Sequence, residues 1–119
     1  MKNQSFARRL GFACGGITYT LRSERNFRIH VVAVVAVFAV MLWLRPAPVW
    51  WAVIALAITL VLAAELVNTA IELLADHLHP ETHPGIKRVK DCAAAAVLVA
   101  SLGALLVAAA LASEYFLAG

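Results

Sequence analysis

Three long apolar stretches without a charged side chain divide this chain, and they limit its fold more than any other feature. They cover residues 31–44, 49–64 and 92–113, and the last is 22 residues long. A helix needs about 20 largely apolar residues to cross the hydrocarbon core of a bilayer. The two shorter stretches reach this length when apolar flanking residues are included. The sequence therefore predicts an all-α membrane protein with three transmembrane helices.

The composition excludes an ordinary water-soluble domain. Apolar residues make up 63% of the 119 residues and charged residues 14%, against about 45–50% and about 25% in soluble domains. A chain of this length forms one domain at most, so we expect residues 1–119 to be a single integral membrane domain. The predicted helices cover about residues 3–22, 26–44, 49–78 and 86–116.

The first of these helices is predicted to lie on the membrane surface. Large apolar side chains such as Phe6 and Leu10 are interleaved with Arg8 and Arg9. This pattern is typical of an amphipathic helix at the boundary between lipid headgroups and acyl chains.

The basic residues predict the orientation of the chain. Nine of the ten Lys and Arg lie before the first span or between the second and third, and Arg45 is the exception. Because basic loops stay in the cytoplasm, we expect the N-terminus and residues 79–85 to be cytoplasmic and residues 45–48 to lie outside. An aromatic belt is then expected at the outer interface, formed by Trp43, Trp50, Trp51 and Tyr115.

A polar stripe follows the second span at its cytoplasmic end. Asn68, Glu72 and Asp76 follow Glu65 by three, seven and eleven residues, which places the four side chains within an arc of about 80° on one helix face. Ionisable residues at membrane depth usually face the interior of a bundle and mark a functional site. A plain amphipathic extension into the cytoplasm is the alternative. It suits Asp76 better than Glu65 and Glu72, which lie among apolar residues.

The charges around this stripe indicate a ligand. Mg²⁺ takes one or two carboxylates and completes its shell with water and phosphate oxygens, and Glu24 is available as a second acidic ligand. Four basic residues are placed to meet phosphates: Arg28, Lys87, Arg88 and Lys90. The sequence has no GxxxxGK[ST] loop, so a nucleotide site here differs from that of P-loop enzymes. No nucleic-acid partner is expected.

Three motifs, in this order, resemble the signature of the prokaryotic diacylglycerol kinase family. They are SERNFRIH at residues 23–30, ELVNTAIE at residues 65–72 followed by Asp76, and VKDCAAAAV at residues 89–97. The resemblance extends over about residues 5–113. It implies a small lipid kinase of the bacterial inner membrane that uses ATP and Mg²⁺ to phosphorylate the primary hydroxyl of a membrane lipid alcohol. It also implies a homotrimer with active sites between subunits.

Independently of the resemblance, the polar stripe predicts an oligomer. Three helices alone are not expected to screen Glu65 and Glu72 from lipid. Residue roles are carried over from the family motif by motif. Glu65 resembles the catalytic base that takes the proton of the lipid hydroxyl, and Asn68 resembles a residue that positions nucleotide or substrate. Glu24 and Glu72 resemble the Mg²⁺ ligands.

The nucleotide contacts are carried over in the same way. Lys90 is expected to contact the ATP phosphates and Asp91 to organise the nucleotide, with Asn68 beside them. Arg28 is expected to meet phosphate, and Asp76 to support the site from its polar end.

The expected substrate is undecaprenol, and diacylglycerol is the alternative. The form ERNFRIH at residues 24–30 resembles the undecaprenol kinase branch, because the diacylglycerol branch tends to carry a second acidic residue in place of His30. Phe12 stands where that branch tends to carry Tyr.

Two other function classes explain part of the pattern. A small multidrug-type transporter needs a fourth span and a carboxylate near mid-bilayer, whereas here the acidic residues gather at one interface. A non-catalytic assembly subunit accounts for the short chain and for oligomerisation, but not for an acidic stripe opposed by Lys90.

The histidines are expected to be structural. His77, His79 and His83 lie around a turn at spacings unlike compact zinc motifs, which favours positions at the aqueous interface or at the helix end. His30 is expected to be a packed or hydrogen-bonded residue at the membrane interface, and not a catalyst.

Overall fold

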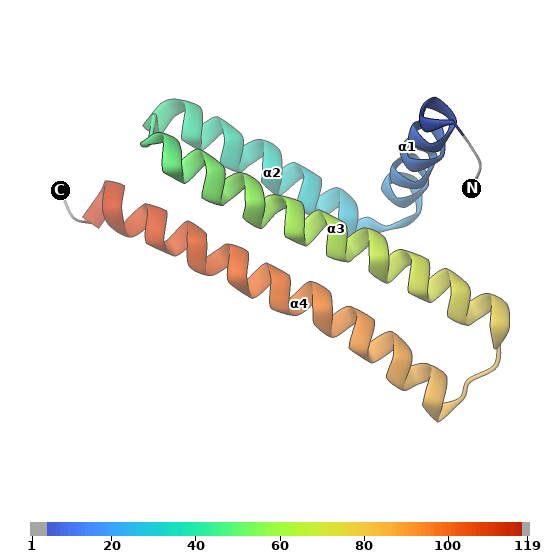
Figure 1. Ribbon diagram of the computed structural model, residues 1–119. Coiled ribbons are helices and arrows are strands. Elements are labelled where there is room, and N and C mark those ends of the chain that lie inside the picture. The colour runs from blue at the N-terminus through green and yellow to red at the C-terminus, as the bar shows by residue number, and fades with distance from the viewer. Residues whose placement is uncertain (1–4, 118–119) are drawn as a thin grey trace.

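The computed structural model describes residues 5–117, which form four α-helices and a terminal π-helical turn (Figure 1). Residues 3–4 of the predicted surface helix lie outside the described residues, as does Lys2, one of the basic residues before the first span. The elements in chain order are α1 (Phe6–Ser23), α2 (Arg25–Leu44), α3 (Pro48–Leu78), α4 (Pro84–Ala112) and η1 (Ser113–Leu117).

Three of these helices are long and apolar enough to cross a membrane, judged by length and composition: α2, α3, and α4 continued by η1. This confirms the prediction of an all-helical chain with three long apolar helices and an additional N-terminal helix. The 31 residues of α3 extend about 46 Å at 1.5 Å per residue, which exceeds the 30 Å or so of a hydrocarbon core. One end of α3 must therefore lie outside the apolar layer.

Proline and backbone capping set the helix ends. Arg45 ends α2 in the left-handed conformation, with φ 52°, and Pro48 begins α3, where its missing N–H costs no helical hydrogen bond. His79 is the C-cap residue of α3. His83 accepts a hydrogen bond from the backbone N–H of Gly85 at 2.9 Å and so caps the start of α4. The expected helix-end position is confirmed for these two histidines.

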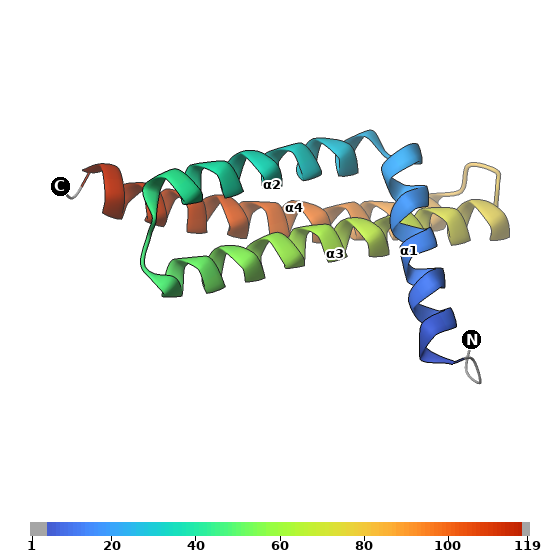
Figure 2. The ribbon, with the colours of Figure 1, turned by 90° about the horizontal axis from the view of Figure 1, so that it is seen from above.

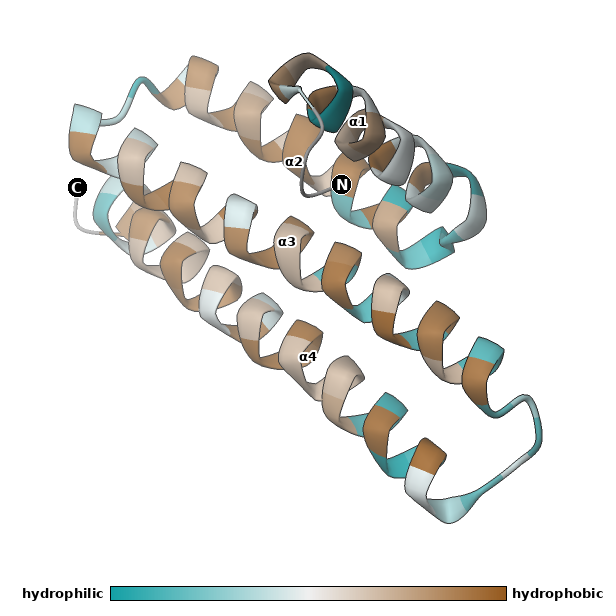
Figure 3. Cartoon of the chain, turned by 45° about the vertical axis from the view of Figure 1, so that its right-hand side comes forward, coloured by the Kyte–Doolittle hydropathy of each residue, from teal (hydrophilic) through white to brown (hydrophobic). Residues whose placement is uncertain are grey.

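The three long helices lie side by side, and α1 crosses them near the start of α2 (Figures 1 and 2). The most extensive contact is between α3 and α4, while α2 packs on α3 and α1 packs on both α2 and α3. The polar residues of α3 and α4 gather toward the turn that joins these helices (Figure 3).

A small core closes the opposite end of the bundle. Met41, Ile54 and Leu111 are buried there, one from each long helix. The η1 turn is tied to the start of α3, because the Tyr115 hydroxyl accepts from the Ala47 N–H at 2.8 Å.

Much of the apolar surface of the long helices faces outward. Val35 on α2, Leu56 on α3 and Leu105 on α4 are each more than 60% exposed. Apolar surface of this extent is not stable in water, so lipid or further copies of the chain must cover it.

Candidate active site

The centre of the candidate site is Glu65, which α3 holds inside the bundle. Its residue surface is only 4% exposed. It shares the buried face of α3 with Val61 one turn before it and Thr69 one turn after it. The Thr69 hydroxyl donates to the backbone carbonyl of Glu65 at 3.0 Å, which satisfies this hydroxyl within the helix. The expected burial of Glu65 is confirmed. It is reached within one chain, so the expectation that Glu65 needs an oligomer to be screened from lipid is wrong.

Among the described residues, His30 of α2 provides the side chain that contacts the Glu65 carboxylate. Its Nδ1 lies 2.7 Å from Glu65 Oε1. The two atoms are in ion-pair contact but are not aligned as a hydrogen bond, so each lacks a hydrogen-bond partner among the described residues. A buried carboxylate without aligned donors costs free energy. We therefore expect Glu65 to gain a hydrogen-bond donor, either from a bound ligand or through a small rotation of the imidazole.

One turn along α3, Asn68 and Glu72 are half-buried and joined to each other. Asn68 Nδ2 donates to Glu72 Oε1 at 3.4 Å, while the buried Asn68 Oδ1 has no partner within the described chain. Unpaired acceptors therefore occur at two successive levels of α3. The region is deficient in hydrogen-bond donors, as expected of a place that receives them from outside the chain.

Glu24 occupies the break between α1 and α2. Its backbone is extended, with φ −112° and ψ 111°, and its N–H bonds to Thr20 O at 2.9 Å. Arg28 Nη1 donates to the carbonyl oxygens of Leu21 and Arg22, both at 2.9 Å, so this predicted phosphate contact caps the C-terminus of α1.

The contact between α1 and α3 lies close to Glu65 along α3. Thr20 and Thr69 are buried and line one cavity between α1 and α3. The α1–α2 junction that carries Glu24 is thereby held at the end of the bundle that holds the acidic stripe.

Two of the four basic residues expected to meet phosphates, Lys87 and Lys90, are already paired in the chain. Lys90 of α4 donates to Asp76 of α3. Lys87 and Asp91 form an exposed pair one turn apart at 2.7 Å. Asp76 and Asp91 are exposed, so both pairs lie in a screened environment where ion pairs are weak. A phosphate could compete for either cation.

The described residues do not assemble a closed metal site. Within residues 5–117, no three His, Cys, Asp or Glu side chains are grouped closely enough to hold an ion. Mg²⁺ that arrives with a nucleotide asks for only one or two protein carboxylates. Glu24 and Glu72 fit this mode of binding better than a preformed cage.

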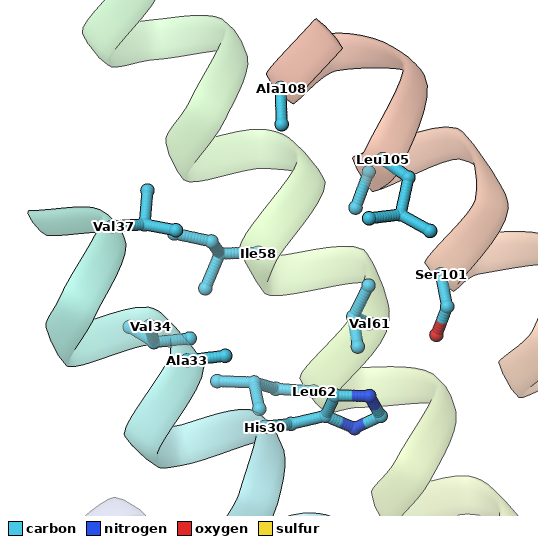
Figure 4. Close-up of a pocket in the computed structure, with 11 residues that line it drawn as sticks. His30, Ala33, Val34, Val37, Ile58, Val61, Leu62, Ser101, Leu105 and Ala108 are labelled. Atoms are coloured by element: carbon cyan, nitrogen blue, oxygen red, sulfur yellow. The ribbon is translucent and has the colours of Figure 1, made fainter. Parts of the chain in front are cut away.

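An apolar cavity of about 250 Å³ runs between α2, α3 and α4 and ends at His30 (Figure 4). Its lining is almost entirely aliphatic, and His30 and Ser101 supply the polar groups. Small residues such as Ala104 leave the space open. The imidazole of His30 therefore touches both the cavity and the Glu65 carboxylate.

The sequence predicts packing or a hydrogen bond for His30 but does not connect this residue with Glu65. The two residues are 35 positions apart, and only the rotation of α2 against α3 decides whether they meet. The motif at residues 23–30 contains both Glu24 and His30, and this is the sequence feature that could have linked His30 to the site.

Comparison with known proteins gives one consistent result. Residues 11–112 match the family model described as prokaryotic diacylglycerol kinase. A diacylglycerol kinase of Synechocystis is 38% identical over 97 residues, which cover 81% of this chain and 55% of that protein. The match thus spans about half the length of the Synechocystis protein.

Two further relatives are matched over more of their length. The undecaprenol kinase of Bacillus subtilis is 40% identical over 84 residues, covering 71% of this chain and 68% of the relative. The diacylglycerol kinase of Escherichia coli is 30% identical over 96 residues, covering 81% and 79% respectively.

Proposed function

The chain belongs to the prokaryotic diacylglycerol kinase family, and we propose that it transfers the γ-phosphoryl group of ATP to the primary hydroxyl of a membrane lipid alcohol. The observation that carries this proposal is the position of Glu65. A buried carboxylate, next to an apolar cavity that ends at His30, is suited to meet a molecule with an apolar tail and a single hydroxyl.

Glu65 acts as the catalytic base. The lipid hydroxyl gives its proton to the carboxylate as its oxygen forms a bond to the γ-phosphorus, and the bond from that phosphorus to the β–γ bridging oxygen breaks. Phosphoryl transfer requires mainly positioning and charge neutralisation, without a covalent intermediate on the protein. Asn68 is half-buried one turn away and positions the nucleotide or the lipid substrate.

Glu24 and Glu72 would be the residues of this chain that hold Mg²⁺. When bound, the ion neutralises the negative charge on the phosphates. The support for this pair is chemical: two carboxylates on adjacent elements at the polar end of the bundle, one of them already oriented by Asn68.

The nucleotide is held by the basic and acidic residues at the inner ends of α2, α3 and α4. Lys90 turns from Asp76 to the phosphates, and Asp91 organises the rest of the nucleotide. Arg28 contributes positive charge from the α1–α2 junction while it caps α1.

The active unit is a homotrimer with sites shared between subunits. Within the described residues of one chain, Asn68 Oδ1 has no partner and much of each long helix is exposed. A neighbouring copy would cover this surface and could supply the missing donors. The number three rests on the family resemblance.

The site faces the cytoplasm from the bacterial inner membrane. The basic residues cluster at the end of the bundle that carries the acidic stripe, as the positive-inside rule requires. The α1 helix lies at the same end, as an amphipathic helix on the inner leaflet. ATP is available on this side.

Undecaprenol is the proposed substrate. The form of residues 24–30, including His30, resembles the undecaprenol kinase branch, and one relative at 40% identity carries that name. Diacylglycerol is the second candidate, because relatives at 38% and 30% identity are named diacylglycerol kinases. Both lipids present one primary hydroxyl on an apolar body.

The test is a direct comparison of initial rates. Purified protein in lipid nanodiscs receives Mg-ATP and either undecaprenol or diacylglycerol, and the phosphorylated lipid is quantified. We expect transfer to undecaprenol at the higher kcat/KM. Glu65→Gln should lower kcat by at least about 100-fold without changing assembly. The matched control is Glu81→Gln in the exposed α3–α4 turn. Inertness of the assembled wild-type protein toward both lipids would refute the kinase proposal.

A further inference from the structure

The contact between His30 and Glu65 gives the proposed base a specific partner. In the described chain no Lys or Arg side chain lies within ion-pair distance of this carboxylate, and His30 is the residue in contact with it. Glu65 Oε1 is completely buried and points to Nδ1 of the imidazole. Glu65 Oε2 makes no hydrogen bond to the described residues. The two oxygens of the base therefore have different surroundings.

The carboxylate of a Glu side chain on α3 could adopt several rotamers, and only some present an oxygen to a bound hydroxyl. Fixing one oxygen removes this freedom. The His30 side chain is 28% exposed and that of Glu65 is 5% exposed, so the contact is shielded from water on the carboxylate side. Charge-assisted contacts are stronger in such surroundings than at an exposed surface.

We propose that His30 is the positioning residue of the base: its imidazole holds Glu65 through Oε1 and leaves Oε2 to take the proton of the lipid hydroxyl. This inference rests on the proposed lipid kinase function and adds a residue to it. His30 does not itself take the proton.

The misalignment in the free chain agrees with this role. Hydrogen bonds of catalytic groups are often poorly aligned before substrate binds and tighten in the complex. The ring also lines the end of the apolar cavity (Figure 4). A lipid tail in that cavity would therefore press on the imidazole and limit its rotation, which links occupation of the cavity to the orientation of the base.

The test replaces His30 by Asn, Gln and Leu. Asn places an amide nitrogen near the position of Nδ1, Gln places it near Nε2, and Leu removes the donor while keeping the bulk. A positioning role predicts that His30→Leu lowers kcat by about tenfold or more, as a fraction of the 10²–10⁴-fold that a general base contributes. The KM for ATP should stay within about twofold, the pattern of an interaction needed in the transition state.

The variants separate positioning from packing. We expect His30→Asn to recover most of kcat and His30→Gln to recover less, because only Asn restores a donor at the Nδ1 position. Both are polar replacements, so this comparison holds even if His30→Leu fails to assemble. The matched control is His77→Leu, an exposed histidine in the last turn of α3, which should leave kcat unchanged.

Three results would overturn the inference while leaving the kinase proposal intact. These are a wild-type kcat in His30→Leu, an equal kcat in the Asn and Gln variants, and a rise in the KM for lipid with no change in kcat. Wild-type protein that assembles but phosphorylates no lipid alcohol would instead refute the proposed function on which the inference rests.

Discussion

Lys90 of α4 and Asp76 of α3 form an ion pair across the turn that joins their helices. The partners are 14 residues apart in sequence, and the pair is one of two Lys–Asp pairs at the polar end of the bundle in the described chain. It keeps the ammonium that we assign to the ATP phosphates beside an exposed carboxylate. Lys90 is therefore positioned by a weak contact that a phosphate can replace.

Lys90→Met should impair nucleotide use far more than it impairs folding. The side chains of Lys90 and Asp76 are 37% and 62% exposed, and such pairs contribute about 0–1 kcal/mol to stability. We expect kcat/KM for ATP to fall by at least about tenfold, since a charge-assisted contact to phosphate is lost, with little change in the thermal unfolding midpoint. Lys90→Arg should retain part of the activity. A Lys90→Met protein with wild-type kcat/KM for ATP would exclude this residue from the nucleotide site.

Glu72→Gln should raise the Mg²⁺ concentration required for activity. The amide keeps the size of the side chain and can still bond to Asn68, but it lacks the charge that a hard cation prefers. In a titration at fixed ATP, we expect half-maximal rate at about tenfold higher Mg²⁺ or more, and chelation should abolish the wild-type rate reversibly. Glu81→Gln serves as the control for loss of one exposed carboxylate charge in the α3–α4 turn. Identical Mg²⁺ curves for Glu72→Gln and wild type would contradict the metal assignment.

Local features of the fold could be predicted from sequence because they depend on near neighbours. The uncharged stretches predict the long helices. Their predicted starts at about residues 49 and 86 lie one and two residues after Pro48 and Pro84, which begin α3 and α4. The burial of Glu65 was also predictable, because it lies in the apolar register of its helix.

Contacts between distant residues could not be predicted in this way. The contact of His30 with Glu65 depends on how α2 is rotated against α3, and the pairing of Lys90 with Asp76 depends on where α4 restarts after the turn. Arg28 shows the same limit: its charge indicated phosphate binding, whereas its position allows it to cap α1.

Thr20→Phe should separate the role of α1 from that of the membrane helices. Thr20 is 3% exposed and lies against α3 in the cavity it shares with Thr69, so a benzyl side chain would displace α1 and with it Glu24. We expect kcat to fall by at least about tenfold, because misplaced groups lose catalysis steeply, while the three long helices stay assembled. Thr18→Phe, at an exposed position on the same helix, is the matched control. An equal kcat for the two variants would show that the packing of α1 against α3 does not position the catalytic groups.

Met41→Ala should destabilise the protein without a specific effect on catalysis. Met41 is 1% exposed and packs with Ile54 and Leu111 at the end of the bundle opposite the candidate site. Truncating a buried side chain of this size costs about 2–5 kcal/mol, because transfer free energy is lost and a cavity remains.

Val32→Ala is the control on the same helix, since Val32 is 69% exposed and its truncation should cost well under about 1 kcal/mol. Thermal unfolding monitored by circular dichroism in one detergent should give a midpoint below that of wild type for Met41→Ala only. The kcat of Met41→Ala, measured well below its midpoint, should match wild type. A loss of kcat in the folded Met41→Ala protein would mean that the core and the site are coupled along the helices, and equal midpoints for the two variants would contradict the position of the core.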